Sequence, residues 1–317
     1  MQIATIWMGA VGSKVIVLEE HFSHPDLLAG MPLKPLGERL LDLGEGRLKA
    51  MDEAGIDLQV LSHFPSGPQN LAPQEAVAQA RRTNDLIHET VRRWPARFAG
   101  FASLPLTAPE EACAELERAV TDLGLKGAML HGMAAGIPLD DRRFWPVFQT
   151  AEALDVPIYI HPDAPPAPVA EAYYQGFPAL IGPGWSYTVE SATQALRLMI
   201  CGLLDECPRL KLILGHMGES LPFSIVRCDS ILTQRANLKR RLVDYFHDHF
   251  WITTAANWSY PALVCTLMEM GSDRVLFSVD WPFASNTEGR DFMDRAPISA
   301  LDRAKILGAN AAALLKL

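Results

Sequence analysis

Four short apolar runs in this sequence each end in a residue that can bind a divalent metal ion. The first run ends at Glu19 and His21, and the later ones end at His161, His216 and Asp280. Imidazole and carboxylate side chains are the ligands that suit zinc, manganese and iron in proteins. Because these residues lie far apart in the sequence, a fold that gathers strand ends must bring them together. The pattern therefore predicts a mononuclear metalloenzyme.

Four of these residues are predicted to form the metal shell. Glu19 and His21 are two apart on one strand and project to the same face, whereas Glu20 is expected to point toward the helices. His161 and Asp280 complete a set of four protein ligands and leave one or two positions open for substrate or water. An acidic Asp280 at the end of an apolar run is costly unless it serves a cation or a proton.

His216 is predicted to be a separate acid–base residue. Glu219 follows three residues later and is placed to orient its imidazole; the alternative is a glutamate that only stabilises a helix N-terminus. Arg227, two turns further on, is expected to hold a substrate carboxylate if it points inward, and is otherwise a surface arginine.

Histidines gather at the predicted strand ends more than packing explains. Five of the nine histidines lie at or just past such an end: His21, His63, His131, His161 and His216. Each one alone would more often be a structural residue, but together they indicate a polar site. His63 and His131, which are outside the metal shell and the acid–base pair, are therefore predicted to lie in the substrate pocket.

The elements that must position these residues alternate along the chain. Nearly continuous apolar runs predict eight buried parallel strands, at 15–21, 58–64, 98–104, 125–131, 157–161, 210–216, 250–255 and 275–280. Amphipathic stretches between them predict helices at 47–54, 74–94, 109–123, 144–154, 189–205, 219–236 and 260–270. This alternation predicts a (β/α)8 TIM barrel. A doubly wound open sheet is the alternative, but no glycine-rich phosphate loop follows the first strand.

Residues 14–317 are predicted to form a single barrel domain, with residues 1–13 as a dispensable extension. Two connections, 22–46 and 163–188, are longer than a plain βα unit needs. Both leave the carboxyl ends of strands, so both are expected to overhang the site. The second is predicted to be a lid or pocket wall, with an oligomer contact as the alternative.

Composition argues against several classes of partner. The 28 Lys and Arg against 37 Asp and Glu give a formal charge of −9, so nucleic acid is not expected. Residues 1–13 are apolar but shorter than the ~20 residues that span a bilayer, so no membrane association is expected. The five cysteines are odd in number and form no close pair, which indicates buried thiols in a reducing cytoplasm.

The motifs around the candidate residues resemble those of the decarboxylase branch of the amidohydrolase superfamily. They are LEEHF at 18–22, IHP at 160–162, ILGHMGE at 213–219 and FSVDWPF at 277–283. Within that branch the chain is most similar to enzymes that act on γ-resorcylate (2,6-dihydroxybenzoate) and other hydroxybenzoates. The likeness runs from about Lys14 to the C-terminus and implies an amidohydrolase-type barrel, one zinc or manganese ion, a small aromatic carboxylic acid as substrate, and a homotetramer or homodimer.

The resemblance also implies residue roles. By position it assigns the metal to Glu19, His21, His161 and Asp280, the catalytic pair to His216 and Glu219, and a subunit or substrate contact to Arg227. The chain departs from the resorcylate enzymes at His131, where they carry asparagine, and His63 is another pocket position. The resemblance therefore implies the reaction class and leaves the substrate open.

The reaction implied is non-oxidative decarboxylation with release of CO2. The ring carbon must be protonated before CO2 departs, and a protonated Asp280 is the predicted acid, while His216 with Glu219 takes or holds the phenolic proton. Trp185 and Phe283 are predicted to form an apolar wall around the ring, with plain packing as the alternative. Two other functions stay open: a hydrolase of a lactone, ester or amide with the same ligands, and a barrel that only binds a ligand.

Overall fold

The structure is a computed structural model and describes residues 14–27 and 35–317. The predicted extension 1–13 and part of the connection 22–46 lie outside these residues. Eight strands are present where eight were predicted: β1 Ile16–Phe22, β2 Leu58–His63, β3 Phe98–Gly100, β4 Ala128–His131, β5 Ile158–His161, β6 Leu212–Leu214, β7 Phe250–Thr253 and β8 Val275–Leu276. Most of them are shorter than predicted. Strands β1, β2, β4 and β5 reach the site residues at their ends, whereas β6 ends before His216 and β8 ends before Asp280.

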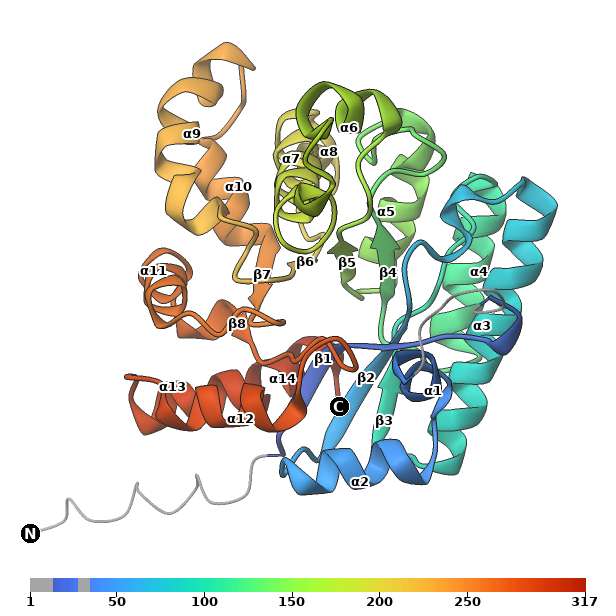
Figure 1. The fold of residues 1–317 in the computed structure, drawn as a ribbon. Helices are drawn as coiled ribbons and strands as arrows, with labels where there is room; N and C mark the ends of the chain where they lie inside the picture. Colours follow the sequence, from blue (N-terminus) through green and yellow to red (C-terminus); the bar gives the residue numbers. More distant parts are fainter. Residues whose placement is uncertain (1–13, 28–34) are drawn as a thin grey trace, which may run out of the picture.

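The strands are parallel and follow one another in chain order. They form a three-stranded sheet, β1-β2-β3, and a five-stranded sheet, β4-β5-β6-β7-β8. Two single parallel bridges join the sheets: Ala102 pairs with Ala128 between β3 and β4, and Leu18 pairs with Ser278 between β1 and the chain just after β8. The first and last strands thus meet, and helices surround the strands (Figure 1). This arrangement is the predicted (β/α)8 barrel.

Helices lie at all seven predicted positions. They are α2 Glu45–Glu53, α3 Pro73–Arg93, α4 Pro109–Thr121, α5 Trp145–Ala153, α7 Ser186–Ile200, α9 Leu221–Arg235 and α11 Tyr260–Met270. The predicted helix 189–205 is interrupted, because Gly202 has a φ of +94° and a new short helix, α8 Leu203–Glu206, begins after it. Six further helices were not predicted: α1 Leu36–Leu41, α6 Ala167–Tyr174, α10 Leu242–His249, α12 Asn286–Arg295, α13 Ala300–Ala304 and α14 Asn310–Leu315.

Two apolar cores hold the barrel together. The larger core lies between the strands and the surrounding helices. The smaller core fills the barrel interior and includes Leu18, Val60 and Ile213 from the strands together with Leu314 and Leu315 from α14. The carboxyl-terminal helix therefore closes the amino-terminal end of the barrel, and the site must be at the opposite end.

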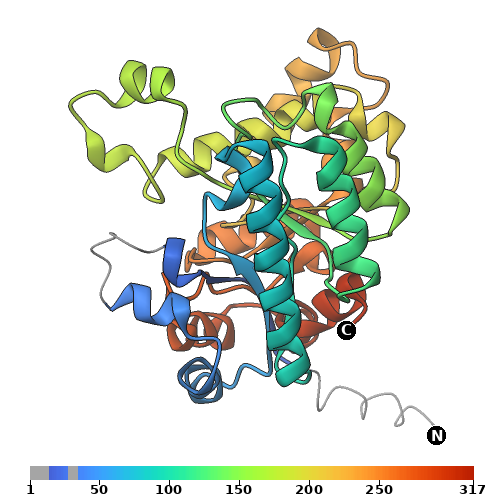
Figure 2. The same cartoon turned by 90° about the vertical axis from the view of Figure 1, so that its right-hand side faces the viewer.

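The connection after β5 projects from the body of the molecule and carries α6 (Figure 2). It then returns to the barrel at the start of α7. In the described part of the chain no helix is long and apolar enough to cross a membrane.

Candidate metal centre and acid–base pair

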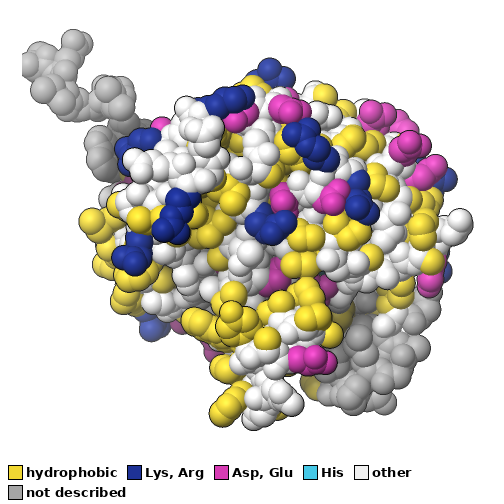
Figure 3. Space-filling model, turned by 90° about the horizontal axis from the view of Figure 1, so that it is seen from above, with side chains coloured by type: hydrophobic (Ala, Val, Ile, Leu, Met, Phe, Trp, Pro, Cys, Tyr) yellow, Lys and Arg dark blue, Asp and Glu magenta, His cyan; other side chains and the backbone are white. Residues whose placement is uncertain are grey.

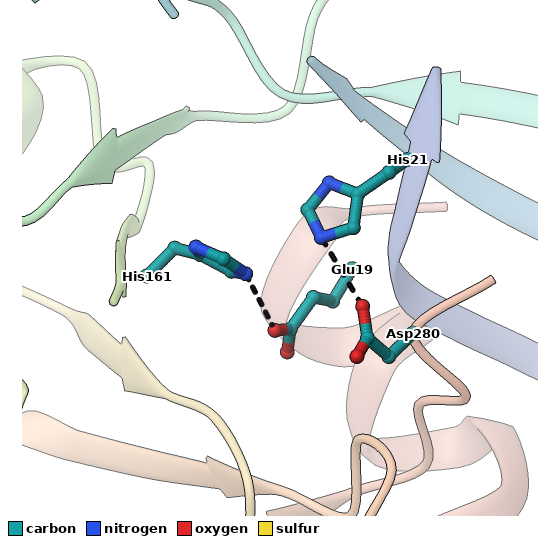
Figure 4. A group of neighbouring side chains, drawn as sticks. All are labelled: Glu19, His21, His161 and Asp280. Atoms are coloured by element: carbon teal, nitrogen blue, oxygen red, sulfur yellow. Dashed lines mark ion pairs between the residues drawn. The ribbon is translucent and has the colours of Figure 1, made fainter. Parts of the chain in front are cut away.

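The four predicted metal ligands meet at the carboxyl ends of β1 and β5 and just beyond β8 (Figure 4). One ligand atom from each of Glu19, His21, His161 and Asp280 lies within 4.8 Å of the other three. Nε2 of His161 is 3.1 Å from Oε1 of Glu19, and Nε2 of His21 is 3.3 Å from Oδ1 of Asp280. Residues from three separated segments thus point at one position.

The donor atoms of this cluster fit a divalent cation. Oε1 of Glu19 and Nε2 of His21 are both buried and have no hydrogen-bond partner among the residues that the structure describes. Buried polar atoms without partners are costly, and here they face one another across a space that a metal ion would satisfy. Two imidazoles and two carboxylates also form a common ligand set for zinc and manganese.

The backbone that carries two of the ligands is not regular strand. Glu19 has a φ of 63° and Asp280 a φ of 73°, both in the left-handed region. The pairing of β1 with β2 shifts register between Val17 and Glu20. Simple alternation along β1, from which a common face for Glu19 and His21 was predicted, therefore does not apply. The ligands reach the site through a bulge, at a backbone cost of about 1–3 kcal/mol per left-handed residue.

Hydrogen bonds fix which ligand atoms face the metal position. The hydroxyl of Tyr159 donates to Oε2 of Glu19 and lies 2.9 Å from Oγ1 of Thr253, which leaves Oε1 of Glu19 for the metal. Oγ of Ser62 lies 3.2 Å from Nδ1 of His21, which leaves Nε2 for the metal. Burial raises the pKa of Glu19, but the neighbouring histidines, His216 foremost, lower it to about 2, so the group is a carboxylate.

The predicted pocket residue His131 lies beside His161, whereas His63 packs edge-on against Phe22, with ring centroids 5.7 Å apart. Nδ1 of His131 is 3.2 Å from Nδ1 of His161, which also contacts the Pro162 carbonyl at 2.7 Å. Both nitrogens of His63 and Nε2 of His131 are buried and have no hydrogen-bond partner in the described part of the chain. Burial lowers the pKa of His63 to about 3 and that of His131 well below its ordinary value, so both rings are neutral at neutral pH.

His216 and Glu219 form the expected pair. Nδ1 of His216 is 2.6 Å from Oε1 of Glu219. Nε2 of His216 faces the metal ligands, 3.3 Å from Oε1 of Glu19 and 4.0 Å from Oδ2 of Asp280. Burial lowers the pKa of His216, but the surrounding carboxylates raise it to about 10. Glu219 is buried and precedes the first residue of α9, so it orients the imidazole rather than only stabilising a helix end.

A cavity of about 550 Å³ opens beside the pair. Its walls come from the start of α7, the start of α9 and the loop after β7, and they include Tyr187 and Asn257. His216, Glu219 and Asp280 line the same cavity, so the candidate acid–base pair and one candidate metal ligand face a space large enough for a small ring. Part of the connection 163–188 thus forms a pocket wall, as predicted.

Among the described residues that line this cavity are none of the five predicted substrate residues, His63, His131, Trp185, Arg227 and Phe283. Phe283 stacks on Phe64 with ring centroids 5.5 Å apart and meets His21 edge-on at 5.8 Å, so it covers the metal cluster. Trp185 is half exposed beside the cavity-lining Gly184 but does not itself line the cavity. Arg227 is on the exposed side of α9 and is not among the described residues that line the cavity. It therefore does not point inward, which was the condition for a substrate contact within one chain.

Several site residues were not found from the sequence. Tyr159 carried a usable signal, because it is two residues before His161 on a buried strand and so shares its face. No comparable sequence signal marked Tyr187 and Asn257, because they follow irregular connections whose course cannot be predicted from the sequence.

Comparison with known proteins agrees with this site. The amidohydrolase family matches residues 21–317. Gamma-resorcylate decarboxylase from Polaromonas sp. strain JS666 is 43% identical over 321 residues, covering 95% of this chain and 98% of that protein. The crystal structure of 2,6-dihydroxybenzoate decarboxylase complexed with 2,6-dihydroxybenzoate has a TM-score of 0.92 and 40% identity, covering 96% of this chain and 100% of that one.

A second solved structure bears on the metal. The crystal structure of dihydroxybenzoic acid decarboxylase from Polaromonas sp. JS666 contains manganese and the inhibitor 2-nitroresorcinol. It has a TM-score of 0.90 and 40% identity, covering 96% of this chain and 98% of that one. The family resemblance of the four motifs is thereby confirmed, and the chain belongs to the amidohydrolase family.

Proposed function

We propose that the protein is a metal-dependent, non-oxidative decarboxylase of a hydroxybenzoate-type aromatic acid. The observation that carries the proposal is the Glu19, His21, His161 and Asp280 cluster beside a histidine–glutamate pair at a cavity, in a chain 43% identical to a γ-resorcylate decarboxylase. The enzyme is a carbon–carbon lyase that releases CO2 and leaves the phenol.

One divalent ion, held by the four clustered side chains, completes the site. When bound, it supplies a Lewis acid that stabilises negative charge on the phenolate and carboxylate oxygens of the substrate. We propose manganese, because a relative with 40% identity contains it, although the ligand types accept zinc as well.

The proton required by the reaction comes from the side chains that line the cavity. Asp280, in its protonated state, delivers a proton to the carboxyl-bearing ring carbon. The bond between that carbon and the carboxyl group then breaks, its electron pair restores the aromatic ring, and CO2 leaves. His216, oriented by Glu219, takes the phenolic proton on Nε2 and returns it to the phenolate oxygen after CO2 has left. Asp280, whose Oδ2 lies 4.0 Å from that nitrogen, regains its proton from water.

The neighbours of the metal cluster give the substrate pocket its specificity. Phe283 covers one side and supports an apolar contact with the ring. Both ring nitrogens of His63 and Nε2 of His131 have no partner among the described residues and can hydrogen-bond a polar ring substituent. Trp185 extends the apolar wall at the mouth of the pocket.

The protein acts as a homo-oligomer in the cytoplasm. Large apolar side chains on the projecting connection and on α9 are strongly exposed, among them Tyr173 at 75%, Phe177 at 67% and Phe223 at 86%. Figure 3 views the molecule from the side of α6, α7 and α9, and hydrophobic side chains are gathered along part of this face. Such a surface supports contact with another copy, in which Arg227 takes part as a subunit contact. All five cysteines are free thiols, which suits a reducing compartment.

The test is direct. Protein loaded with Mn²⁺ is incubated with 2,6-dihydroxybenzoate and with other ortho-hydroxybenzoates while CO2 is measured. Release of one CO2 per phenol formed supports the proposal. Absence of CO2 from every ortho-hydroxybenzoate, together with turnover of a lactone, ester or amide, would replace it with a hydrolase.

A further inference from the structure

Glu20, which stands between two metal ligands, is fully buried and makes two hydrogen bonds to the other side of the site. Its Oε1 accepts from the backbone N–H of Val279 at 3.0 Å, and its Oε2 accepts from the backbone N–H of Trp281 at 3.1 Å. These two residues flank Asp280. The carboxylate of Glu20 therefore holds the backbone on both sides of a metal ligand rather than pointing only toward the helices.

The two hydrogen bonds of Glu20 lie where β1 and the chain beyond β8 form little regular strand pairing. β8 ends at Leu276, and in the part of the chain that the structure describes a single bridge, Leu18 with Ser278, joins β1 to the chain beyond it. The remaining backbone contact at the level of the ligands is from His21 N–H to the Trp281 carbonyl at 2.6 Å. Asp280 itself is in the left-handed region, so a strand ladder cannot set its orientation.

Arg47 supports the same junction from the other side of β1. Its side chain is buried and donates from Nη2 to the His21 carbonyl at 2.5 Å and from Nε to the Asp42 carbonyl at 2.8 Å. Its positive charge also interacts favourably with Glu20, which offsets part of the cost of burying that carboxylate.

We infer that Glu20 is a positioning residue that fixes Asp280 for metal binding by clamping the N–H groups of Val279 and Trp281. The inference rests on the proposed function in assigning Asp280 to the metal, but it does not depend on the identity of the substrate. A carboxylate suits this task because it has two acceptor atoms and no donor, whereas an amide has only one acceptor. Support of this kind around a metal ligand contributes strongly to metal affinity.

The experiment compares Glu20→Gln with the wild type and with Glu115→Gln, using Mn²⁺ alone as the probe. Glu115 is also a buried carboxylate, but it accepts from Asn84 and Arg118 in the helix layer, outside the site. Glu20→Gln keeps the size of the side chain, removes one acceptor and places an NH2 against a backbone N–H. We expect it to weaken Mn²⁺ affinity at least about tenfold and to alter the Mn²⁺ electron paramagnetic resonance spectrum.

Glu115→Gln is expected to lower the melting temperature without changing Mn²⁺ affinity or its spectrum. A Glu20→Gln protein that binds Mn²⁺ with wild-type affinity and spectrum would overturn the inference. If this variant does not fold, amide hydrogen exchange in the wild type decides: slow exchange at Val279 and Trp281 supports the clamp, and fast exchange overturns it. These measurements use no substrate, so they test the role of Glu20 independently of the reaction. A wild type that binds Mn²⁺ but releases no CO2 would refute the proposed function without deciding the role of Glu20.

Discussion

The hydrogen bond of 2.6 Å between Nδ1 of His216 and Oε1 of Glu219 determines which nitrogen of the imidazole faces the four clustered side chains. Because Nδ1 is committed to Glu219, only Nε2 faces the metal ligands Glu19 and Asp280. His216 and Glu219 are only three residues apart in the sequence. Their hydrogen bond nevertheless orients the imidazole toward Glu19 on β1 and Asp280 beyond β8.

Replacing His216 by asparagine should lower kcat by about 10²–10⁴, since proton transfer by a positioned side chain contributes about that much. Mn²⁺ binding should persist, because the four ligands are untouched. The matched control is His247→Asn, a half-exposed histidine paired with Glu269 away from the site. Steady-state kinetics of CO2 release measure both, and equal kcat values for the two variants would contradict the assignment.

Removal of the metal should abolish activity. Treatment with a chelator followed by dialysis is expected to give an inactive protein, and stoichiometric Mn²⁺ should restore it. Glu19→Gln should resist restoration, because an amide oxygen is a weaker ligand than a carboxylate at a site otherwise held by two imidazoles. Elemental analysis gives the metal content, and a fully active metal-free protein would exclude this mechanism.

Tyr159→Phe should weaken Mn²⁺ affinity by about 10–100-fold, the usual effect of losing a group that orients a metal ligand. The change removes only the hydroxyl that donates to Oε2 of Glu19. Tyr245→Phe removes a comparable bond, 2.6 Å to Asp205 in the helix layer, and should leave affinity unaltered. Calorimetric titration with Mn²⁺ distinguishes the two, and an unaltered affinity in Tyr159→Phe would show that Glu19 is held by the backbone alone.

His131→Asn should change the preference among hydroxybenzoates. We expect the ratio of kcat/KM for 2,6-dihydroxybenzoate to that for a monohydroxybenzoate to shift about tenfold, because a hydrogen-bonding partner for a ring substituent is exchanged. His88→Asn is the control, since His88 bonds to the Leu123 carbonyl outside the site. An unchanged ratio would mean that His131 only supports His161.

Acid should destabilise the metal-free protein partly through His249. Burial lowers the pKa of His249 below its ordinary value of 6.5, while Nδ1 is 2.8 Å from the Leu210 carbonyl. The folded pKa is below the unfolded one, so this contribution to the free energy of unfolding is present above pH 6.5 and is lost as the pH falls below it. Chemical denaturation at pH values between 7.5 and 5 should show that the free energy of unfolding decreases less in His249→Gln than in the wild type. Equal losses would exclude His249 as a source of the acid sensitivity.

The barrel and the cluster of candidate metal ligands could be predicted because each corresponds to a pattern that is recognisable in the sequence. Buried parallel strands are nearly continuous apolar runs, and ligand types are recognisable at their ends. The position of Arg227 was not predictable in the same way, because the rotation of α9 about its axis decides whether the residue faces the cavity. Glu20 was placed by strand alternation, and that argument failed because the left-handed backbone at Glu19 breaks the alternation.

Pairing between the first and the last strand has a consequence for how the enzyme matures. The bridge from Leu18 to Ser278 joins residues at opposite ends of the chain, and contacts of such long sequence separation form late and slowly in folding. The metal ligands lie on both sides of this junction, with Glu19 and His21 before it and Asp280 after it. A partly folded chain in which these two strands are not yet paired therefore has an incomplete ligand set. Binding of a metal ion by all four ligands indicates that the last strand has packed against the first.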